Sequence, residues 1–305
     1  APVRLTILGS GWGAFRLLKD ICPKTYSVTV VSPRNHVLFT PMLPSASVGT
    51  VSTRSITESL RPLCIEKGAR LCEAHAEHLD LKKKTVQCRS LHGERYTVPY
   101  DRLVLAVGKK ANDFGIPGVQ RNAFFIKETA DARRLREALL TRFEEAACIV
   151  ARSSTCGLRP SDEQVAQVEQ LLRVIVVGGG PISAGFSEHL VDFIGRDVRR
   201  TYPDLIPYMS VHLVEWASCT QIHRKDQALR EYMLQRLSQR SGVQLHRGEH
   251  IEGVTQSELR LESGRSIPYG TLVWNAGMKP VPIVQSADLP KARNDSKVRT
   301  DECLR

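Results

Sequence analysis

Two glycine-rich turns, one in each half of the chain, constrain the fold more than any other feature of the sequence. The first reads LGSGWGA over residues 8–14, and the second reads VGGGPISA over residues 177–184. A short apolar run precedes each turn, and a segment that can begin a helix follows it. This order is typical of a dinucleotide-binding unit, in which the glycines let the backbone approach a pyrophosphate at the helix N-terminus. Two such turns predict two dinucleotides on one chain, most economically a flavin and a nicotinamide.

The apolar patterns around these turns predict an α/β protein whose second half repeats the plan of the first. For the first half we expect strands at 4–8, 27–31, 70–76, 84–89, 95–98 and 103–108, helices at 12–21, 129–147 and 163–171, a loop at 33–56 and a surface connection at 150–162. For the second half we expect strands at 174–177, 211–215, 243–246 and 271–277, helices at 182–195 and 225–240, and a hairpin at 251–267.

Composition narrows the choice of partners. The net charge of +11 over 305 residues favours anionic partners, namely dinucleotide phosphates, acidic lipid surfaces or nucleic acid, although a solvated basic surface accounts for it equally well. Aromatic residues make up only 6% of the chain, which argues against a stacking platform for single strands. The eight cysteines form no Cys-x-x-Cys pair, and the nine histidines show no metal-binding spacing, so we expect no metal site and no dithiol chemistry.

The first turn supplies three candidate binding residues. Gly9 and Gly11 are the phosphate-turn glycines, and Ala14 stands at the third position, where a small side chain allows the helix to pack on the strand. An acid that binds ribose hydroxyls is usual at the end of the second strand. Here the residue is Ser32, which can bond a hydroxyl more weakly, and Lys109 and Lys110 after the closing strand are more simply a solvated pair.

The second half of the chain does have an acid at the end of the strand that follows its glycine turn. Gly178 and Gly180 are in place, and Ser183 occupies the third position. Glu215 ends the strand predicted at 211–215, where a carboxylate can accept both ribose hydroxyls of NAD and repel the 2′-phosphate of NADP. A strand-end glutamate is often only solvated, but its place after a glycine turn favours a binding role.

Longer segments of the sequence resemble one protein family. SPRNHVLFTPMLPS at 32–45, FGIPGV at 114–119 and NAGMKP at 275–280 are similar to segments of type II (alternative, rotenone-insensitive) NADH:quinone oxidoreductases, and the opening SPR fits the mitochondrial branch. The similarity runs over essentially the whole chain. It implies two Rossmann-like dinucleotide-binding domains, as in pyridine nucleotide-disulfide oxidoreductases, with the second inserted in the first.

The resemblance also implies cofactors and the residues that hold them. NADH would give hydride to FAD, and electrons would pass to ubiquinone without proton pumping, so no catalytic side chain is expected. The FAD residues would be Gly9, Gly11, Ala14, Ser32, Thr40, Pro41, Ala106 and Gly108, and the NADH residues would be Gly178, Gly180, Glu215 and Gly277.

Domain limits and location follow from the same resemblance. Residues 1–150 would form the FAD domain, with 283–305 returning to it, and 173–282 would form the NADH domain. The protein would lie peripherally on the mitochondrial inner membrane, through a C-terminal part beyond residue 305, and would have no nucleic-acid partner. The quinone, the face of the membrane and a homodimeric state are left open.

Two departures from the family pattern keep an alternative open. First, Gly185 replaces a glutamate that in the family lies near the nicotinamide and flavin. Second, the last segment of the sequence, 298–305, resembles the segment that precedes the family's second FAD element. A degenerate or truncated dinucleotide-binding protein without turnover is therefore the second hypothesis. A basic flavoprotein that binds nucleic acid is the third, and no motif supports it.

Overall fold

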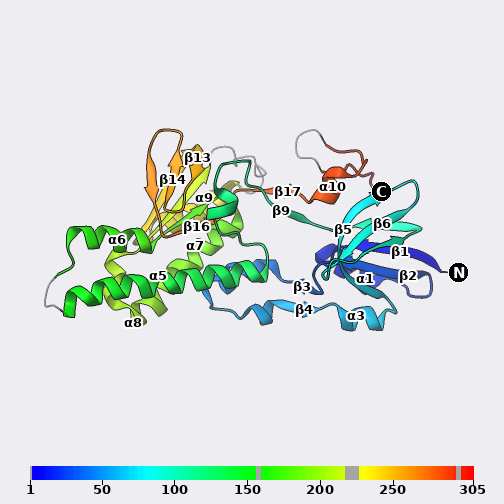
Figure 1. The fold of residues 1–305 in the computed structure, drawn as a ribbon, viewed down its shortest axis with the longest axis horizontal. Coiled ribbons are helices and arrows are strands. Elements are labelled where there is room, and N and C mark those ends of the chain that lie inside the picture. The colour runs from blue at the N-terminus through cyan, green and yellow to red at the C-terminus, as the bar shows by residue number, and fades with distance from the viewer. Residues whose placement is uncertain (1, 156–158, 217–226, 293–296) are drawn as a thin grey trace. The chain divides into compact units, whose positions relative to one another are not determined.

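The structure is a computed structural model that describes residues 2–155, 159–216, 227–292 and 297–305. The chain forms two compact units (Figure 1). The first unit comprises residues 1–39, 57–110 and 278–305, and the second comprises 40–56 and 111–277. The second unit is thus inserted in the first along the sequence, which confirms the predicted architecture.

A six-stranded sheet with the order β7-β6-β5-β2-β1-β8 forms the centre of the first unit. The strands β1, β2, β5 and β8 are parallel, whereas β6 and β7 continue the sheet as an antiparallel meander. Its elements are β1 (Val3–Leu8), α1 (Trp12–Asp20), β2 (Tyr26–Ser32), β3 (His36–Leu38), β4 (Thr57–Ser59), α3 (Arg61–Glu66), β5 (Arg70–Asp80), β6 (Thr85–Ser90), β7 (Arg95–Pro99), β8 (Arg102–Leu105), β9 (Lys109–Ala111), β17 (Met278–Pro280) and α10 (Pro282–Ser286).

Successive side chains of a strand point to opposite faces of the sheet, and apolar side chains of this sheet are packed on both faces. On one face, Leu5 and Ile7 of β1 pack with Leu18 of α1. On the other face, Leu8 packs in a cluster that includes Ile283 of α10. The apolar runs predicted as buried parallel strands are therefore buried on both sides.

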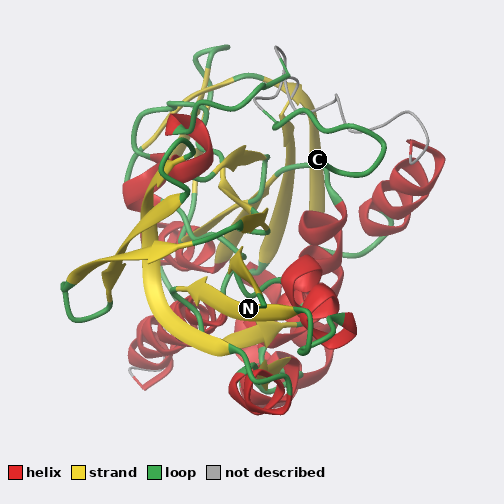
Figure 2. Cartoon of the chain, turned by 90° about the vertical axis from the view of Figure 1, so that its right-hand side faces the viewer, coloured by secondary structure: helices red, strands yellow, loops and turns green. Residues whose placement is uncertain are grey.

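A four-stranded parallel sheet with the order β12-β11-β10-β16 forms the centre of the second unit, beside a three-stranded antiparallel sheet, β13-β14-β15. In Figure 2 the strands are yellow and the helices red. The elements up to β10 are η1 (Thr40–Met42), α2 (Leu43–Val48), η2 (Thr53–Ile56), α4 (Val119–Asn122), α5 (Thr129–Thr155), α6 (Asp162–Leu172) and β10 (Arg173–Val177). From there follow α7 (Pro181–Phe193), η3 (Ile194–Val198), α8 (Arg199–Thr201), η4 (Pro203–Tyr208), β11 (Ser210–Trp216), α9 (Gln227–Ser238), β12 (Val243–Glu249), β13 (Ile251–Val254), β14 (Glu258–Leu261), β15 (Ser266–Pro268) and β16 (Thr271–Trp274).

The helix α5 is longer than the sequence predicts. It was expected to end near residue 147, with a surface connection from 150, but it continues to Thr155 (green in Figure 1). Its buried residues recur every three or four positions, which is the spacing of one helix face: Ala132, Leu135, Leu139, Phe143 and Ala146. Ser161 and Gln164 form a capping box at the start of α6.

Three other expectations differ from the structure. The segment 33–56, predicted as a loop, contains β3 and the fully buried helix α2. The apolar strands predicted at 103–108 and 271–277 end at Leu105 and Trp274, and their glycines follow in irregular backbone. Residues 40–56 and 111–150, expected in the first domain, belong to the second compact unit. Of the helix predicted at 225–240, residues 225 and 226 lie outside the described residues.

Candidate functional site

The first glycine turn adopts a conformation that only glycine supports easily. Gly9 has φ +108°, and its N–H donates to the carbonyl of Val31 at 2.8 Å. A Cβ at Gly9 would stand 2.3 Å from the carbonyl oxygen of Ala106, so the chain has no room for a side chain here. Gly11 caps α1 without a side-chain hydrogen bond, and Ala14 is buried against β1. The turn therefore offers an uncovered helix N-terminus that fits a phosphate group.

A cation and two hydroxyls occupy the place where an acid was expected in the first unit. Ser32 is buried, and its Oγ donates to Ser10 Oγ at 3.0 Å. The backbone N–H of Arg34 donates to Ser32 Oγ at 3.1 Å, and Arg34 Nε donates to Ser10 Oγ at 3.3 Å. The guanidinium thus lies against the glycine turn. Sequence reasoning missed Arg34 because its side chain folds back onto a residue 24 positions earlier.

The closing strand of the first unit completes this turn. The N–H of Ala106 donates to the carbonyl of Leu8 at 2.9 Å, which ties the residue after β8 to the end of β1. Gly108 has φ +69°, and a Cβ there would meet nothing within 4 Å. Glycine is needed at this position for its backbone conformation rather than for close packing.

The second turn repeats these contacts in the second unit. Gly178 has φ +128°, and its N–H donates to the carbonyl of Val214 at 2.9 Å. A Cβ there would stand 2.6 Å from the carbonyl oxygen of Asn275 and 2.8 Å from Ser183 Oγ. Gly180 caps α7 without a side-chain hydrogen bond, so the amides at this helix start are also uncovered. The two turns have the same construction. In each, the glycine after the first strand lies against a backbone carbonyl that follows the closing strand, Ala106 in the first unit and Asn275 in the second.

Two polar atoms beside the second turn lack partners within the described part of the chain. They are Ser183 Oγ and Asn275 Nδ2, both buried from solvent. Asn275 Oδ1 accepts a hydrogen bond from the N–H of Ile126 at 3.3 Å. Buried polar atoms are normally paired, so this end of the sheet fits a ligand with hydrogen-bonding groups.

Glu215 lies where the sequence predicted the ribose-binding acid. It is the next-to-last residue of β11, and its side chain is only 9% exposed. Arg247 of β12 is its register partner on the neighbouring strand, with Arg247 Nε 3.9 Å from Glu215 Oε2. The sequence did not indicate Arg247, because its approach to Glu215 depends on the pairing of two strands more than 30 residues apart.

A pair of histidines, of which His212 is buried and His246 half-buried, lies on the same two strands. The rings of His212 and His246 stack with centroids 5.1 Å apart, and a nitrogen of each ring lies 3.2 Å from the other. Burial, and then the nearby positive charge, lower the pKa of His212 to about 4, and burial also lowers the pKa of His246. Both rings are therefore neutral at physiological pH.

Gly277 lies in the second unit against an aromatic ring. A Cβ at Gly277 would stand 2.7 Å from Phe114 Cζ, and the carbonyl of Gly277 accepts from the N–H of Asn112 at 2.9 Å. Any larger residue at 277 would displace this ring.

Thr40 and Pro41 belong to a different compact unit from Gly9 and Gly11. They form η1, which leads into α2, and α2 packs on α5 and α7 in the second unit. Ser45 Oγ of α2 hydrogen-bonds His189 Nε2 of α7 at 3.0 Å. The segment expected near the flavin is thus held by the helix that follows the second glycine turn.

Gly185 lies on α7 with open space above it. The nearest atom to a Cβ at this position is Cγ of Pro44, at 3.9 Å, an ordinary van der Waals separation. A Cβ at 185 therefore fits without displacing α2, and packing does not require a glycine in place of an alanine.

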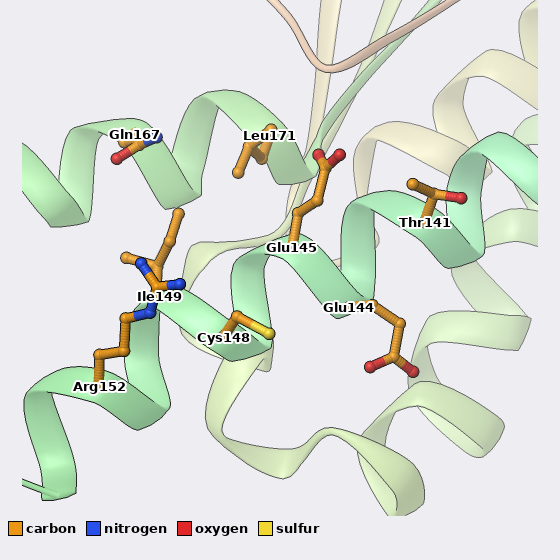
Figure 3. A pocket seen from close by; sticks show the side chains of 8 residues that line it. All are labelled: Thr141, Glu144, Glu145, Cys148, Ile149, Arg152, Gln167 and Leu171. Carbon is orange, nitrogen blue, oxygen red and sulfur yellow. The ribbon is translucent and has the colours of Figure 1, made fainter.

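A separate depression of about 470 Å³ lies between α5 and α6 (Figure 3). Its two acids already have partners: Glu145 pairs with Arg142 at 2.7 Å, and Glu144 accepts from the hydroxyl of Tyr202 at 2.5 Å. It contains neither glycine turn nor Glu215, so it offers no nucleotide chemistry. The glycine turns remain the candidate sites.

The predicted resemblance to type II oxidoreductases is confirmed by comparison with known proteins. The chain is 35% identical over 319 residues to the external alternative NAD(P)H-ubiquinone oxidoreductase B4, mitochondrial, of Arabidopsis thaliana, covering 100% of this chain and 52% of that protein. It is 36% identical to the internal alternative NAD(P)H-ubiquinone oxidoreductase A1, mitochondrial, of Solanum tuberosum, covering 99% and 60%. The chain therefore spans little more than half the length of these relatives.

A solved structure and a family model agree with this relationship. The structure of NDH2 from Plasmodium falciparum in complex with NADH superposes with a TM-score of 0.81 at 27% identity, over 97% of this chain and 59% of that one. The model of the pyridine nucleotide-disulphide oxidoreductase family matches residues 3–305. The two glycine turns have the same construction, and the family model matches nearly the whole chain. The protein therefore belongs to the pyridine nucleotide-disulphide oxidoreductase family.

Proposed function

We propose that this chain is the dinucleotide-binding part of a type II NADH:quinone oxidoreductase, with FAD on the first unit, NADH on the second and ubiquinone as the electron acceptor. The observation that carries the proposal is the duplicated turn, in which Gly9 and Gly178 lie under matching strand-end carbonyls. The relatives named for ubiquinone support the acceptor.

In the first unit, the turn from Gly9 to Gly11 would hold the FAD pyrophosphate at the start of α1, with Arg34 beside it. Ser32 would meet the adenosine ribose, while Ala14, Ala106 and Gly108 would shape the turn. When bound, FAD supplies a two-electron acceptor for hydride. The chain's own contribution is to orient the partners and exclude water, so no nucleophilic side chain is required.

In the second unit, Gly178 and Gly180 would hold the NADH pyrophosphate, and Glu215 would accept hydrogen bonds from the ribose hydroxyls. Gly277 would lie at the nicotinamide end, where the lack of a side chain lets the ring of Phe114 pack against its backbone. The unpartnered Nδ2 of Asn275 supports a ligand at this edge of the sheet.

The mitochondrial names of the relatives support a mitochondrial location. We further propose peripheral attachment to the inner membrane and a homodimer. Light scattering, which measures the mass of the protein in solution, tests the dimer. No helix within the described ranges is long and apolar enough to cross a membrane.

The decisive experiment is an anaerobic titration of the FAD-loaded full-length protein with NADH, followed through the visible absorption of the flavin. Loss of that absorption, and reoxidation by a soluble ubiquinone analogue, are the expected results. A flavin that stays oxidised while NADH binds would instead support the second hypothesis, a dinucleotide-binding protein without turnover. Gly185, which replaces the family glutamate, is the observation that keeps this alternative.

A further inference from the structure

The carboxylate of Glu215 has a cationic neighbour fixed by the sheet itself. Glu215 and Arg247 are register partners on the parallel strands β11 and β12, so their side chains leave the same face of the sheet. Arg247 Nε lies 3.9 Å from Glu215 Oε2. The carboxylate is almost fully buried, whereas the arginine is about half exposed, at 49%. The guanidinium is therefore accessible to a ligand that approaches Glu215.

A second acid competes for the same arginine. Glu231 of α9 lies 3.1 Å from Arg247 Nη2 and is 44% exposed. Arg247 is therefore shared between a buried carboxylate on the neighbouring strand and a solvated one on a helix. The solvated pair is shorter, but exposed ion pairs are weak and break readily. Arg247 can thus leave Glu231 when a stronger anion is present, but breaking the 3.1 Å pair opposes the move.

The chemistry of the adenosine ribose gives this arrangement a consequence. A carboxylate at the strand end accepts hydrogen bonds from the 2′- and 3′-hydroxyls of NADH and repels the 2′-phosphate of NADPH. A guanidinium binds phosphate through two parallel hydrogen bonds. An acid alone at this position would reject NADPH strongly, whereas an acid beside an available arginine tolerates both coenzymes.

We propose that Arg247 is a specificity-determining residue of the second unit, which lets it accept NADPH as well as NADH, and that Glu231 restrains it. The inference rests on the proposed function, since it requires that the second unit holds the coenzyme. It assigns opposite roles to the two partners of Arg247: Glu215 favours the unphosphorylated ribose, and Glu231 limits the arginine's reach toward the 2′-phosphate.

The test measures binding of ADP-ribose and of its 2′-phosphorylated form to the FAD-loaded protein by calorimetry, so that no electron transfer is needed. We expect wild type to bind both and to prefer ADP-ribose. Arg247→Gln should weaken the 2′-phosphorylated ligand about tenfold, the lower end for loss of a charged hydrogen bond, and change ADP-ribose binding far less. Glu231→Gln should strengthen the 2′-phosphorylated ligand. The control is Arg260→Gln, which removes an equal charge from an exposed position on β14 in the antiparallel sheet.

The outcomes separate the two levels of inference. Unchanged selectivity in Arg247→Gln, or a loss equal to that of Arg260→Gln, would overturn the role of Arg247 and leave the proposed function intact. Selectivity that moves the same way in Arg247→Gln and Glu231→Gln would overturn the restraint by Glu231. Binding of neither ligand by correctly folded wild type would overturn the coenzyme role of the second unit, and this inference with it.

Discussion

Replacing Gly178 with alanine is expected to destabilise the second unit severely. The residue has φ +128°, which costs an L-residue roughly 1–2 kcal/mol. The new Cβ would also stand 2.6 Å from the carbonyl oxygen of Asn275 and 2.8 Å from Ser183 Oγ. Overpacking of this kind costs roughly 1–3 kcal/mol, because backbone must shift to relieve it. The free energy of unfolding should therefore fall by roughly 2–5 kcal/mol.

Gly185→Ala is the matched control on the helix that follows the same turn. A Cβ at 185 meets nothing closer than Pro44 Cγ, at 3.9 Å, and the residue lies inside α7. Alanine there should raise the free energy of unfolding by roughly 0.5–1 kcal/mol. Urea unfolding followed by circular dichroism measures both variants, and calorimetry with ADP-ribose measures the turn itself.

Opposite signs for the two glycines, with ADP-ribose binding lost only in Gly178→Ala, would agree with the geometry. If Gly178→Ala unfolded at the same urea concentration as wild type and still bound ADP-ribose, the close approach of Gly178 to the Asn275 carbonyl would be wrong. If Gly185→Ala were instead destabilising, the space above α7 would be filled, and the Pro44 distance would be refuted.

Three further predictions concern other residues. Burial lowers the pKa of His212 from 6.5 to about 4, so the folded protein resists protonation of this ring. The free energy of unfolding should therefore fall by up to about 3 kcal/mol as the pH drops from 6.5 to about 4. In His212→Gln, unfolding measured over this range should depend less on pH. Ser161→Ala should lower stability by about 1 kcal/mol, measured by urea unfolding, because it removes the capping box of α6, whereas Ser161→Asp should retain most of it. Arg34→Gln should reduce the FAD retained after desalting, while Arg102→Gln, which removes an exposed charge from β8, should not; equal retention in both variants would exclude Arg34 from the flavin site.

Local sequence sufficed for the elements whose physical cause is local. The apolar runs before Gly9 and Gly178 could be identified as buried strands, because short β-branched segments that are apolar on both faces fit little else. The glycines after them could be assigned because a left-handed backbone excludes most other residues. The capping box at Ser161 is likewise a local feature, since its hydrogen bonds span three residues.

Element ends were less predictable than element types. The helix α5 continues past residue 147 because it packs on α6, where Ser153 Oγ donates to Gln164 Oε1, and the composition near residue 150 does not reveal this. The helix α2 lies in a segment rich in Pro and Thr, and burial against α5 and α7 outweighs its weak helix propensity.

The sequence by itself determined the two strand–turn–helix units, their glycines and the acid at Glu215, because each depends on residues within one turn or one strand. Only the tertiary structure decided which unit holds residues 40–56, and which charges surround the two strand ends. Arg34 reaches Ser10, and Arg247 reaches both Glu215 and Glu231, across folds of the chain that no local pattern encodes. Long-range strand register places a guanidinium beside each turn's strand end, and that placement governs the charge that a dinucleotide would meet.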